Sequence, residues 1–122
     1  MITLKTLDKA TEQDVFDQVV KHMLTQMERS LVAKNSLTCL YKSPTGLKCA
    51  AGCLIGDDEY KEGMEGFSWD ELVKKNIAPK KHSDLIRSLQ SIHDGTYPYQ
   101  WPKQLFNLSK ELRLMFNPPH IG

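Results

Sequence analysis

The chain has 122 residues, and its 16 lysines and arginines against 15 acidic residues give a formal net charge of +1. This length predicts a single domain over residues 1–122 that buries roughly two thirds of its unfolded surface, so that stability requires neither a disulfide nor a metal. The balanced charge disfavours both a nucleic-acid mimic and a protein held to DNA by counterion release, so a nucleic-acid partner is not expected.

The three cysteines and the N-terminus indicate the compartment. An odd number of cysteines argues against a disulfide framework, and residues 1–8 lack the apolar core and cleavage site of a signal peptide. No apolar run approaches the roughly 20 residues of a membrane span. We therefore expect a cytoplasmic protein with free thiols and no membrane association.

Two capping boxes predict the first two helices. One at residues 11–14 opens a helix whose apolar residues recur at helical spacing as far as Leu31. The other, at residues 68–71, opens a short helix that Asn76 and Pro79 close.

Two further helices follow in the C-terminal part. Apolar spacing predicts one from about residue 82 to residue 94, with Gly95 as its stop. The last begins near Pro102, which a first helical turn accepts, and keeps apolar spacing to Met115 before Pro118 and Pro119 end it.

The segment between the first two helices predicts a β-hairpin. An apolar run is interrupted there by a Pro-x-Gly turn at residues 44–46, and all three cysteines and five of the seven glycines fall within residues 39–66. With four helices, this hairpin predicts an α+β fold, a single domain of about four helices packed on a small β-hairpin.

The turn type decides how the cysteines meet. A type I turn with a glycine bulge at Gly46 places Lys42 opposite Lys48, and Cys39 opposite Ala51 and diagonal to Cys49. A two-residue loop would instead put Cys39 and Cys49 on opposite faces.

The same segment carries a resemblance. The pattern comprises Cys39-x-Tyr41-Lys42, Gly46-x-Lys48-Cys49-Ala50-x-Gly52-x-Leu54-Ile55, Asp57, Tyr60, Glu65-Gly66, then Leu89-Gln90-x-Ile92-His93-Asp94 and Trp101. It resembles a group of small bacteriophage and prophage proteins of no settled activity, in which proline is common where this chain has Gly56. The resemblance implies a phage origin and a bacterial cytoplasm.

The sequence gives little support for a catalytic site or a metal site. A thiol-dependent enzyme would use Cys49 as nucleophile and His93 as base, with Asp94 or Asp58 orienting the histidine, but no known thiol-enzyme signature surrounds Cys49. Cys49-x3-Cys53 is not a zinc-knuckle spacing. The four histidines, which form no spaced pair, are His22, His82, His93 and His120. We expect no metal, no cofactor, and cysteines that are mostly buried.

Two charged segments are predicted to lie on the solvent-exposed surface. The acidic residues do not follow the calcium-loop pattern and indicate a solvated turn; they are Asp57, Asp58, Glu59, Glu62 and Glu65. The basic residues around Pro79 could attract phosphate with the help of a helix dipole, but they also suit helix ends and a polar linker, and matched acids dilute their field; they are Lys74, Lys75, Lys80, Lys81, His82 and Arg87.

An aromatic segment at residues 97–102 completes the candidates. Rings with polar handles in a proline-braced loop can anchor a protein interface, although Trp101 can equally cover the core. The predicted binding residues are Tyr97, Tyr99, Trp101, Asp57, Asp58 and Tyr60. For one site, the aromatic loop and the acidic turn have to be neighbours.

The functional prediction is a binding protein rather than an enzyme. The resemblance, the small size and the missing catalytic set favour a phage protein that binds a host protein and interferes with a host process, such as bacterial immunity. The thiol-dependent enzyme centred on Cys49, and a small-molecule binder with a pocket between hairpin and aromatic loop, are the alternatives.

Overall fold

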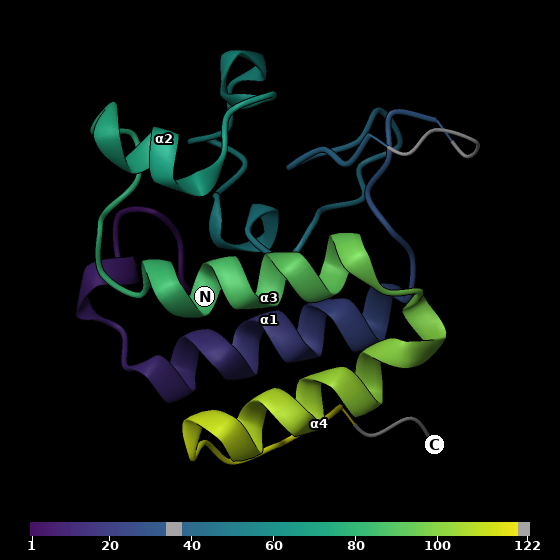
Figure 1. Ribbon diagram of the computed structural model, residues 1–122. Coiled ribbons are helices and arrows are strands. Elements are labelled where there is room, and N and C mark those ends of the chain that lie inside the picture. Colours follow the sequence, from purple (N-terminus) through teal and green to yellow (C-terminus); the bar gives the residue numbers. More distant parts are fainter. Residues whose placement is uncertain (34–37, 120–122) are drawn as a thin grey trace.

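Three helices lie side by side in the computed structural model, which describes residues 1–33 and 38–119 (Figure 1). α1 (Glu12–Gln26) and α3 (Ser83–Gly95) run in the same direction, and α4 (Trp101–Leu112) returns beside them; each packs on the other two. The short α2 (Trp69–Lys74) packs on α3. Four 3-10 turns lie in the connections: η1 (Leu7–Lys9), η2 (Gly52–Leu54), η3 (Glu62–Met64) and η4 (Pro98–Gln100).

The helices meet through the apolar faces that the sequence spacing predicts. The fully buried side chains include Phe16 and Met23 of α1, Leu89 of α3, and Trp101 and Leu105 of α4. Burying a side chain of this size contributes roughly 1.5–3 kcal/mol, so these contacts are the main source of stability. No helix in the described part of the chain is long and apolar enough to cross a membrane.

The predicted helix starts are confirmed. The Thr11 hydroxyl accepts a hydrogen bond from the Asp14 amide at 3.1 Å, and the Ser68 hydroxyl accepts one from the Glu71 amide at 3.2 Å, each within a complete capping box. Pro102 lies in the first turn of α4, where its missing N–H costs nothing.

Two predicted helix ends are wrong. α1 ends at Gln26 and does not reach Leu31, because Met27 is left-handed and tertiary hydrogen bonds hold the next residues outside helical geometry. α4 ends at Leu112 rather than beyond Met115, whose amide instead donates to Gln13 Oε1 at 2.8 Å. Both ends show tertiary contacts overriding helical spacing.

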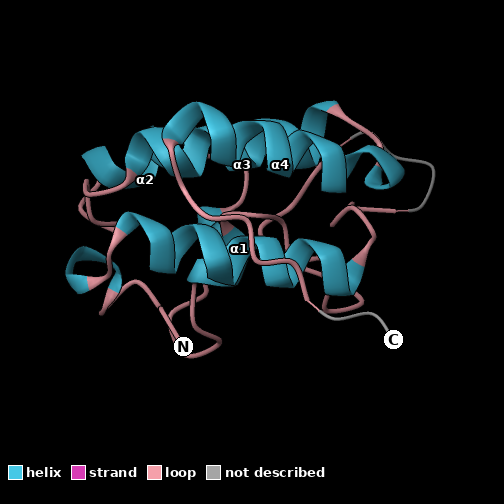
Figure 2. Ribbon diagram, turned by 90° about the horizontal axis from the view of Figure 1, so that it is seen from below, coloured by secondary structure: helices cyan, strands magenta, loops and turns pink. Residues whose placement is uncertain are grey.

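The predicted α+β fold is also wrong. The protein is mostly helical, and the described residues form no sheet and no hairpin, only isolated bridges (Figure 2). The bridge between Lys42 and Lys48 has the predicted pairing, and Gly46 has the expected positive φ of 90°. Cys39, however, pairs with Leu31 and not with Ala51.

Side chains from other elements explain why no hairpin forms. The Glu65 carboxylate accepts the backbone N–H groups of Tyr41 at 2.9 Å and of Lys42 at 3.1 Å. Gln26 of α1 accepts the amide of Lys48 at 3.1 Å. Gln90 of α3 accepts that of Ala51 at 2.9 Å. Donors that a strand would offer to a partner strand are thereby taken, and the segment stays irregular.

Gly52 lies very close to another part of this segment. A Cβ atom built on Gly52 would collide with the backbone carbonyl of Tyr41, far inside van der Waals contact. Since the carbonyl belongs to a pinned backbone, it cannot move aside as a flexible side chain would.

We expect Gly52→Ala to destabilise the protein by roughly 2 kcal/mol or more, because the added methyl group forces the backbone around Tyr41 to shift. Gly63→Ala is the matched control, since a Cβ there meets nothing within 4 Å, and it should change stability by less than about 0.5 kcal/mol. Urea unfolding of both variants measures the difference. Equal stabilities would contradict the close packing of Gly52 under Tyr41.

Candidate functional site

Two exposed tyrosines lie in the connection between α3 and α4. Tyr97 is 59% and Tyr99 76% exposed, and their rings stack with centroids 5.8 Å apart and planes 6° from parallel. Large aromatic side chains left in solvent and held face to face are unusual in a surface that serves stability alone.

Side-chain contacts from other parts of the chain hold the loop that carries the two tyrosines, residues 96–100. Arg29 donates from Nε and Nη2 to the carbonyl of Thr96, at 3.2 and 2.7 Å, and its guanidinium lies 5.0 Å from the centre of the Tyr97 ring. The Tyr97 amide donates to Gln100 Oε1 at 2.9 Å, and Pro98 opens η4. Arg29 was absent from the sequence predictions, since nothing in the sequence ties it to the loop.

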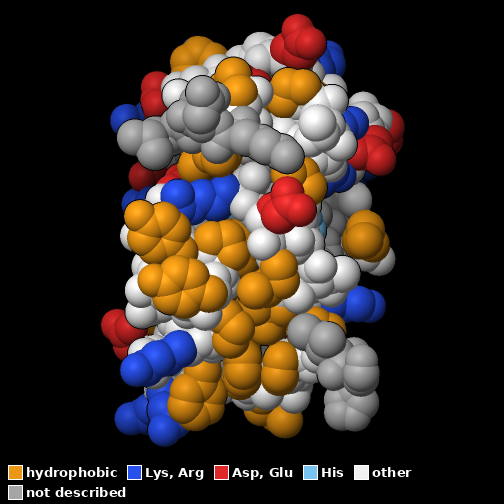
Figure 3. All heavy atoms as spheres, turned by 90° about the vertical axis from the view of Figure 1, so that its right-hand side faces the viewer, with side chains coloured by type: hydrophobic (Ala, Val, Ile, Leu, Met, Phe, Trp, Pro, Cys, Tyr) orange, Lys and Arg blue, Asp and Glu red, His pale blue; other side chains and the backbone are white. Residues whose placement is uncertain are grey.

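An apolar hollow lies beside the loop that carries the two rings, and Pro98 of that loop lines it. Its volume is about 460 Å³, and it lies between the end of α1, the turn at residues 44–47 and the aromatic loop. Its apolar lining consists of Met27, Leu31, Val32, Ala33, Pro44, Leu47 and Pro98. We call Tyr97, Tyr99 and this lining the tyrosine surface; Figure 3 shows apolar side chains gathered over this end of the molecule.

Trp101 does not belong to that surface. Its side chain is completely buried and stacks on His93, with ring centroids 5.3 Å apart. Trp101 therefore covers the core, which is one of the two roles that the sequence allows for it, and its side chain is not available to a partner.

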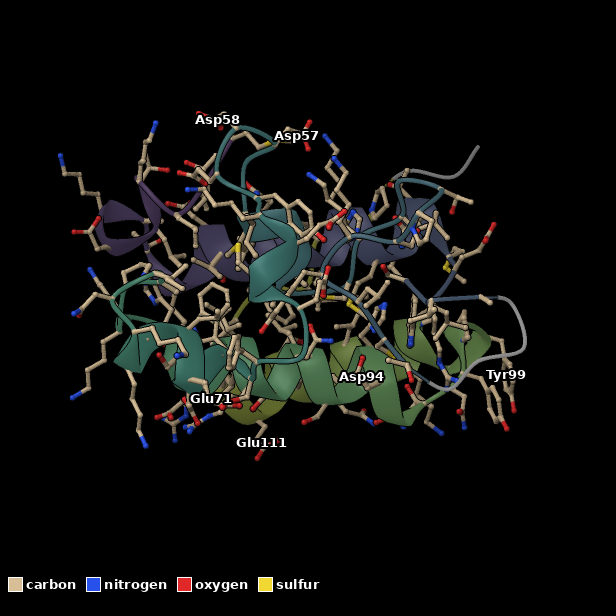
Figure 4. The ribbon with its side chains drawn as sticks, turned by 90° about the horizontal axis from the view of Figure 1, so that it is seen from above. Asp57, Asp58, Glu71, Asp94, Tyr99 and Glu111 are labelled. Atoms are coloured by element: carbon tan, nitrogen blue, oxygen red, sulfur yellow. The ribbon has the colours of Figure 1, made fainter. Side chains whose placement is uncertain are left out.

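The acidic turn lies apart from the tyrosines. Figure 4 places Asp57 and Asp58 at a different edge of the molecule from Tyr99. Asp57 pairs with Lys48 at 3.0 Å and with Lys42 at 3.7 Å. These lysines, Lys48 above all, lower the pKa of Asp57. Since the turn and the loop are not neighbours, the predicted single site separates into two surfaces.

Most other groups of the acidic segment have structural roles. Glu59 accepts the amides of Leu4, Lys5 and Gly56. Glu65 accepts the Tyr60 hydroxyl at 2.6 Å in addition to its two backbone amides. These two carboxylates accept backbone amides that would otherwise need a partner strand or a cap, and the Tyr60 hydroxyl holds the Glu65 carboxylate in place.

His93 also has both ring nitrogens occupied. The Ser30 amide can only donate, so at 3.2 Å from Nε2 it requires that nitrogen to accept. The proton therefore sits on Nδ1, which lies 2.7 Å from Asp94 Oδ1. Asp94 orients His93 as predicted, but the nitrogen that a general base would use is taken by the backbone.

The three side chains Cys39, His93 and Asp94 have ligand atoms within 4.8 Å of one another. A metal on Nδ1 of His93 would move the ring proton to Nε2, where it would face the N–H of Ser30. Two N–H donors, one on His93 and one on Ser30, would then point at each other in a buried site. The hydrogen bonding therefore does not suit a metal ion.

Cys39 and Cys49 line a cleft of about 720 Å³ between α3 and the irregular segment, together with Asp94. Burial raises the pKa of Cys39 to about 12, with a hydrogen bond to Asp94 adding to the rise, and burial likewise raises the pKa of Cys49. The Cys49 thiol is 1% exposed and accepts the Gly52 amide. Neither thiol is arranged as a nucleophile.

The remaining histidines have structural contacts or fall outside the described residues. His22 Nε2 lies 2.8 Å from the carbonyl of Lys48, and His82 Nε2 lies 2.7 Å from that of Ala10. His120 lies outside the described residues.

Comparison of the chain with protein-family models, with curated proteins and with solved structures finds no match.

We expect thiol reagents to modify Cys39 and Cys53 slowly in the folded protein and Cys49 only after unfolding. Burial raises the pKa of Cys53 to about 12, as it does that of Cys39, so few thiolates are present at neutral pH. Mass spectrometry of timed labelling, with the unfolded chain as reference, measures the three rates. Fast, selective modification of Cys49 would support the enzymatic alternative instead.

A second prediction concerns Asp94. Burial raises its pKa, but hydrogen bonds from His93, Gln90 and Cys39 outweigh burial and hold the pKa below its usual value. A lowered pKa stabilises the fold above the unfolded value of about 3.9, and the gain is lost as the pH falls through the folded value. Because the Asp94 side chain is 43% exposed, water screens part of this effect. Asp94→Asn should therefore lower stability by roughly 0.5–1 kcal/mol at neutral pH, and the difference should shrink on acidification.

Urea unfolding at several pH values measures that difference. Asp58→Asn, which removes an exposed ion pair with Lys5, is the control and should cost less than about 0.5 kcal/mol. A pH-independent loss for Asp94→Asn would show that the carboxylate charge is not what stabilises the His93 contact.

Proposed function

We propose that this protein acts by binding another protein through the tyrosine surface. The observation that carries the proposal is the stacked, exposed pair Tyr97 and Tyr99 beside an apolar hollow of about 460 Å³. Tyrosine and arginine are the residue types that most often dominate binding energy at protein interfaces.

Preorganisation supports this proposal. Arg29 and Pro98 hold the loop before a partner arrives, so little conformational entropy is lost when the rings are covered. An apolar side chain of the partner would enter the hollow, while the tyrosine hydroxyls stay at the rim and can hydrogen-bond.

The nature of the partner rests on the sequence. The resemblance to small bacteriophage proteins favours a host protein as the partner, and interference with a host process such as bacterial immunity as the outcome. A thiol enzyme is less well supported, because the Ser30 amide occupies His93 Nε2 and burial raises the pKa of both thiols in the cleft.

We expect the double variant Tyr97→Ala/Tyr99→Ala to bind the partner at least about tenfold to a hundredfold more weakly, because both anchors are removed. The melting temperature should change little, since exposed rings contribute little to stability. Capture from bacterial lysates by the wild-type chain identifies the partner, and calorimetry with the purified partner measures the affinity.

Phe106→Ala is the matched control, because Phe106 is also an exposed aromatic residue but lies on α4, outside the tyrosine surface. It should retain binding. If the double variant unfolds, the single variant Tyr99→Ala, at the more exposed ring, decides the question. Unchanged affinity in a folded tyrosine variant would place the binding site elsewhere.

A further inference from the structure

The end of the molecule opposite the tyrosine surface is rich in lysine. Lysines gather there from the segment before α1, from the end of α2 and from the connection to α3; they are Lys5, Lys9, Lys74, Lys75, Lys80 and Lys81. Nitrogen-tipped side chains project from this end in Figure 4, away from Tyr99. This arrangement brings together charges that lie far apart in the sequence.

A groove of about 690 Å³ crosses this end. Lys5, Lys74 and Lys80 line it, and Asp8 is the only carboxylate among its lining residues, all of which the structure describes. A neighbouring hollow shares Leu4, Lys5 and Ile77 with it and adds one lysine, Lys61, and one carboxylate, Glu59. We call the two together the lysine groove.

Most of these lysines lack a carboxylate partner. Lys5 lies 3.4 Å from Asp58, whereas Lys9, Lys61, Lys74, Lys75, Lys80 and Lys81 form no ion pair within the described residues. Lys81 donates instead to the backbone carbonyl of Asp8 at 2.9 Å.

Three of the nearby acids have other partners, whereas Asp8 lines the groove and Glu71 lies one helical turn from Lys75. Asp70 and Asp84 both pair with Arg87, and Glu59 accepts backbone amides. The lining of the lysine groove holds four lysines against two carboxylates, Asp8 and Glu59, so the near-neutral charge of the whole chain conceals a local excess of positive charge.

We propose that the lysine groove binds the phosphate backbone of a nucleic acid without reading its sequence. Unpaired cations arranged along a polar groove attract a polyanion and gain from counterion release. Every cation lining the groove is a lysine. Bidentate recognition of either carboxylate or phosphate would favour arginine, whereas lysine acts as a point charge. A groove lined by lysines alone therefore suits a polyanion that is held by its charge density rather than by fixed geometry, as a phosphate backbone is.

The groove also lacks the features of base recognition. Ile77, which is 40% exposed, offers an apolar contact to a sugar or base, but no aromatic ring lines the groove for stacking. Phosphate contacts without stacking give affinity and position but not sequence specificity.

The test measures fluorescence anisotropy of labelled single-stranded RNA, single-stranded DNA and duplex DNA of about 20 nucleotides or base pairs, in roughly 50 mM salt. The groove variant is Lys61→Gln/Lys74→Gln/Lys80→Gln, which replaces three of the lysines that line the groove. The control variant, Lys21→Gln/Lys103→Gln/Lys110→Gln, removes three exposed lysines from α1 and α4 and changes the net charge equally.

We expect the wild-type chain and the control variant to bind at least one of these nucleic acids. The groove variant should bind at least roughly tenfold more weakly, with the salt dependence reduced by about one contact per lysine removed. Melting curves establish that both variants are folded. Tyr97→Ala/Tyr99→Ala should leave this binding unchanged, which separates it from the proposed protein interface.

Three results would overturn the proposal. The first is no binding by the wild-type chain at low salt, and the second is an equal loss in the groove and control variants. The third is binding of polyglutamate at least as tight as that of every nucleic acid tested, which would assign the groove to an acidic protein segment.

Discussion

The fold depends on how the backbone between residues 39 and 66 satisfies its hydrogen-bonding groups without a sheet. Backbone carbonyls in turns accept many of its amides, and four side chains complete the pattern: Glu65, Glu59, Gln26 and Gln90 accept backbone amides of the segment or of its neighbours. An unpaired buried amide costs about as much as a lost hydrogen bond, so each of these acceptors stabilises the path of the chain. The irregular segment is thereby fixed on a helical base.

The same kind of contact positions the tyrosine surface. Arg29 and Ser30 follow the end of α1. The Ser30 amide donates to His93, near the end of α3, and the Arg29 guanidinium donates to the carbonyl of Thr96, just after α3. These bonds tie the end of α1 to the start of the aromatic loop, and Trp101 packs beneath them against His93. The position of the exposed rings therefore depends on the hydrogen bonds of Ser30 and Arg29 as well as on the loop itself.

The helical part of the fold was predictable from local signals. The capping boxes at Thr11 and Ser68 and Pro102 in the first turn of α4 act within a few residues of the chain, so sequence spacing is enough to reveal them. Gly95 is the last residue of α3 rather than a left-handed stop beyond it, and Thr96 caps the helix.

The missing hairpin was not predictable in that way. The residues that replace a partner strand lie far from the backbone amides they accept: Gln90 is 39 residues from Ala51 and Glu65 is 24 residues from Tyr41. A glutamine on a helix carries no local sign that it will bond to a distant loop. The exposed tyrosines were recognisable from their proline-braced segment, whereas Arg29 and the lysine groove depend on tertiary structure.

The side-chain pinning of residues 39–66 has a kinetic consequence. Gln26 and Gln90 can accept their amides only after α1 and α3 have formed and packed, so the segment should become ordered late in folding. Contacts formed after the transition state affect mainly the unfolding rate. Loss of either glutamine would then shorten the lifetime of the native state while leaving the speed of folding nearly unchanged.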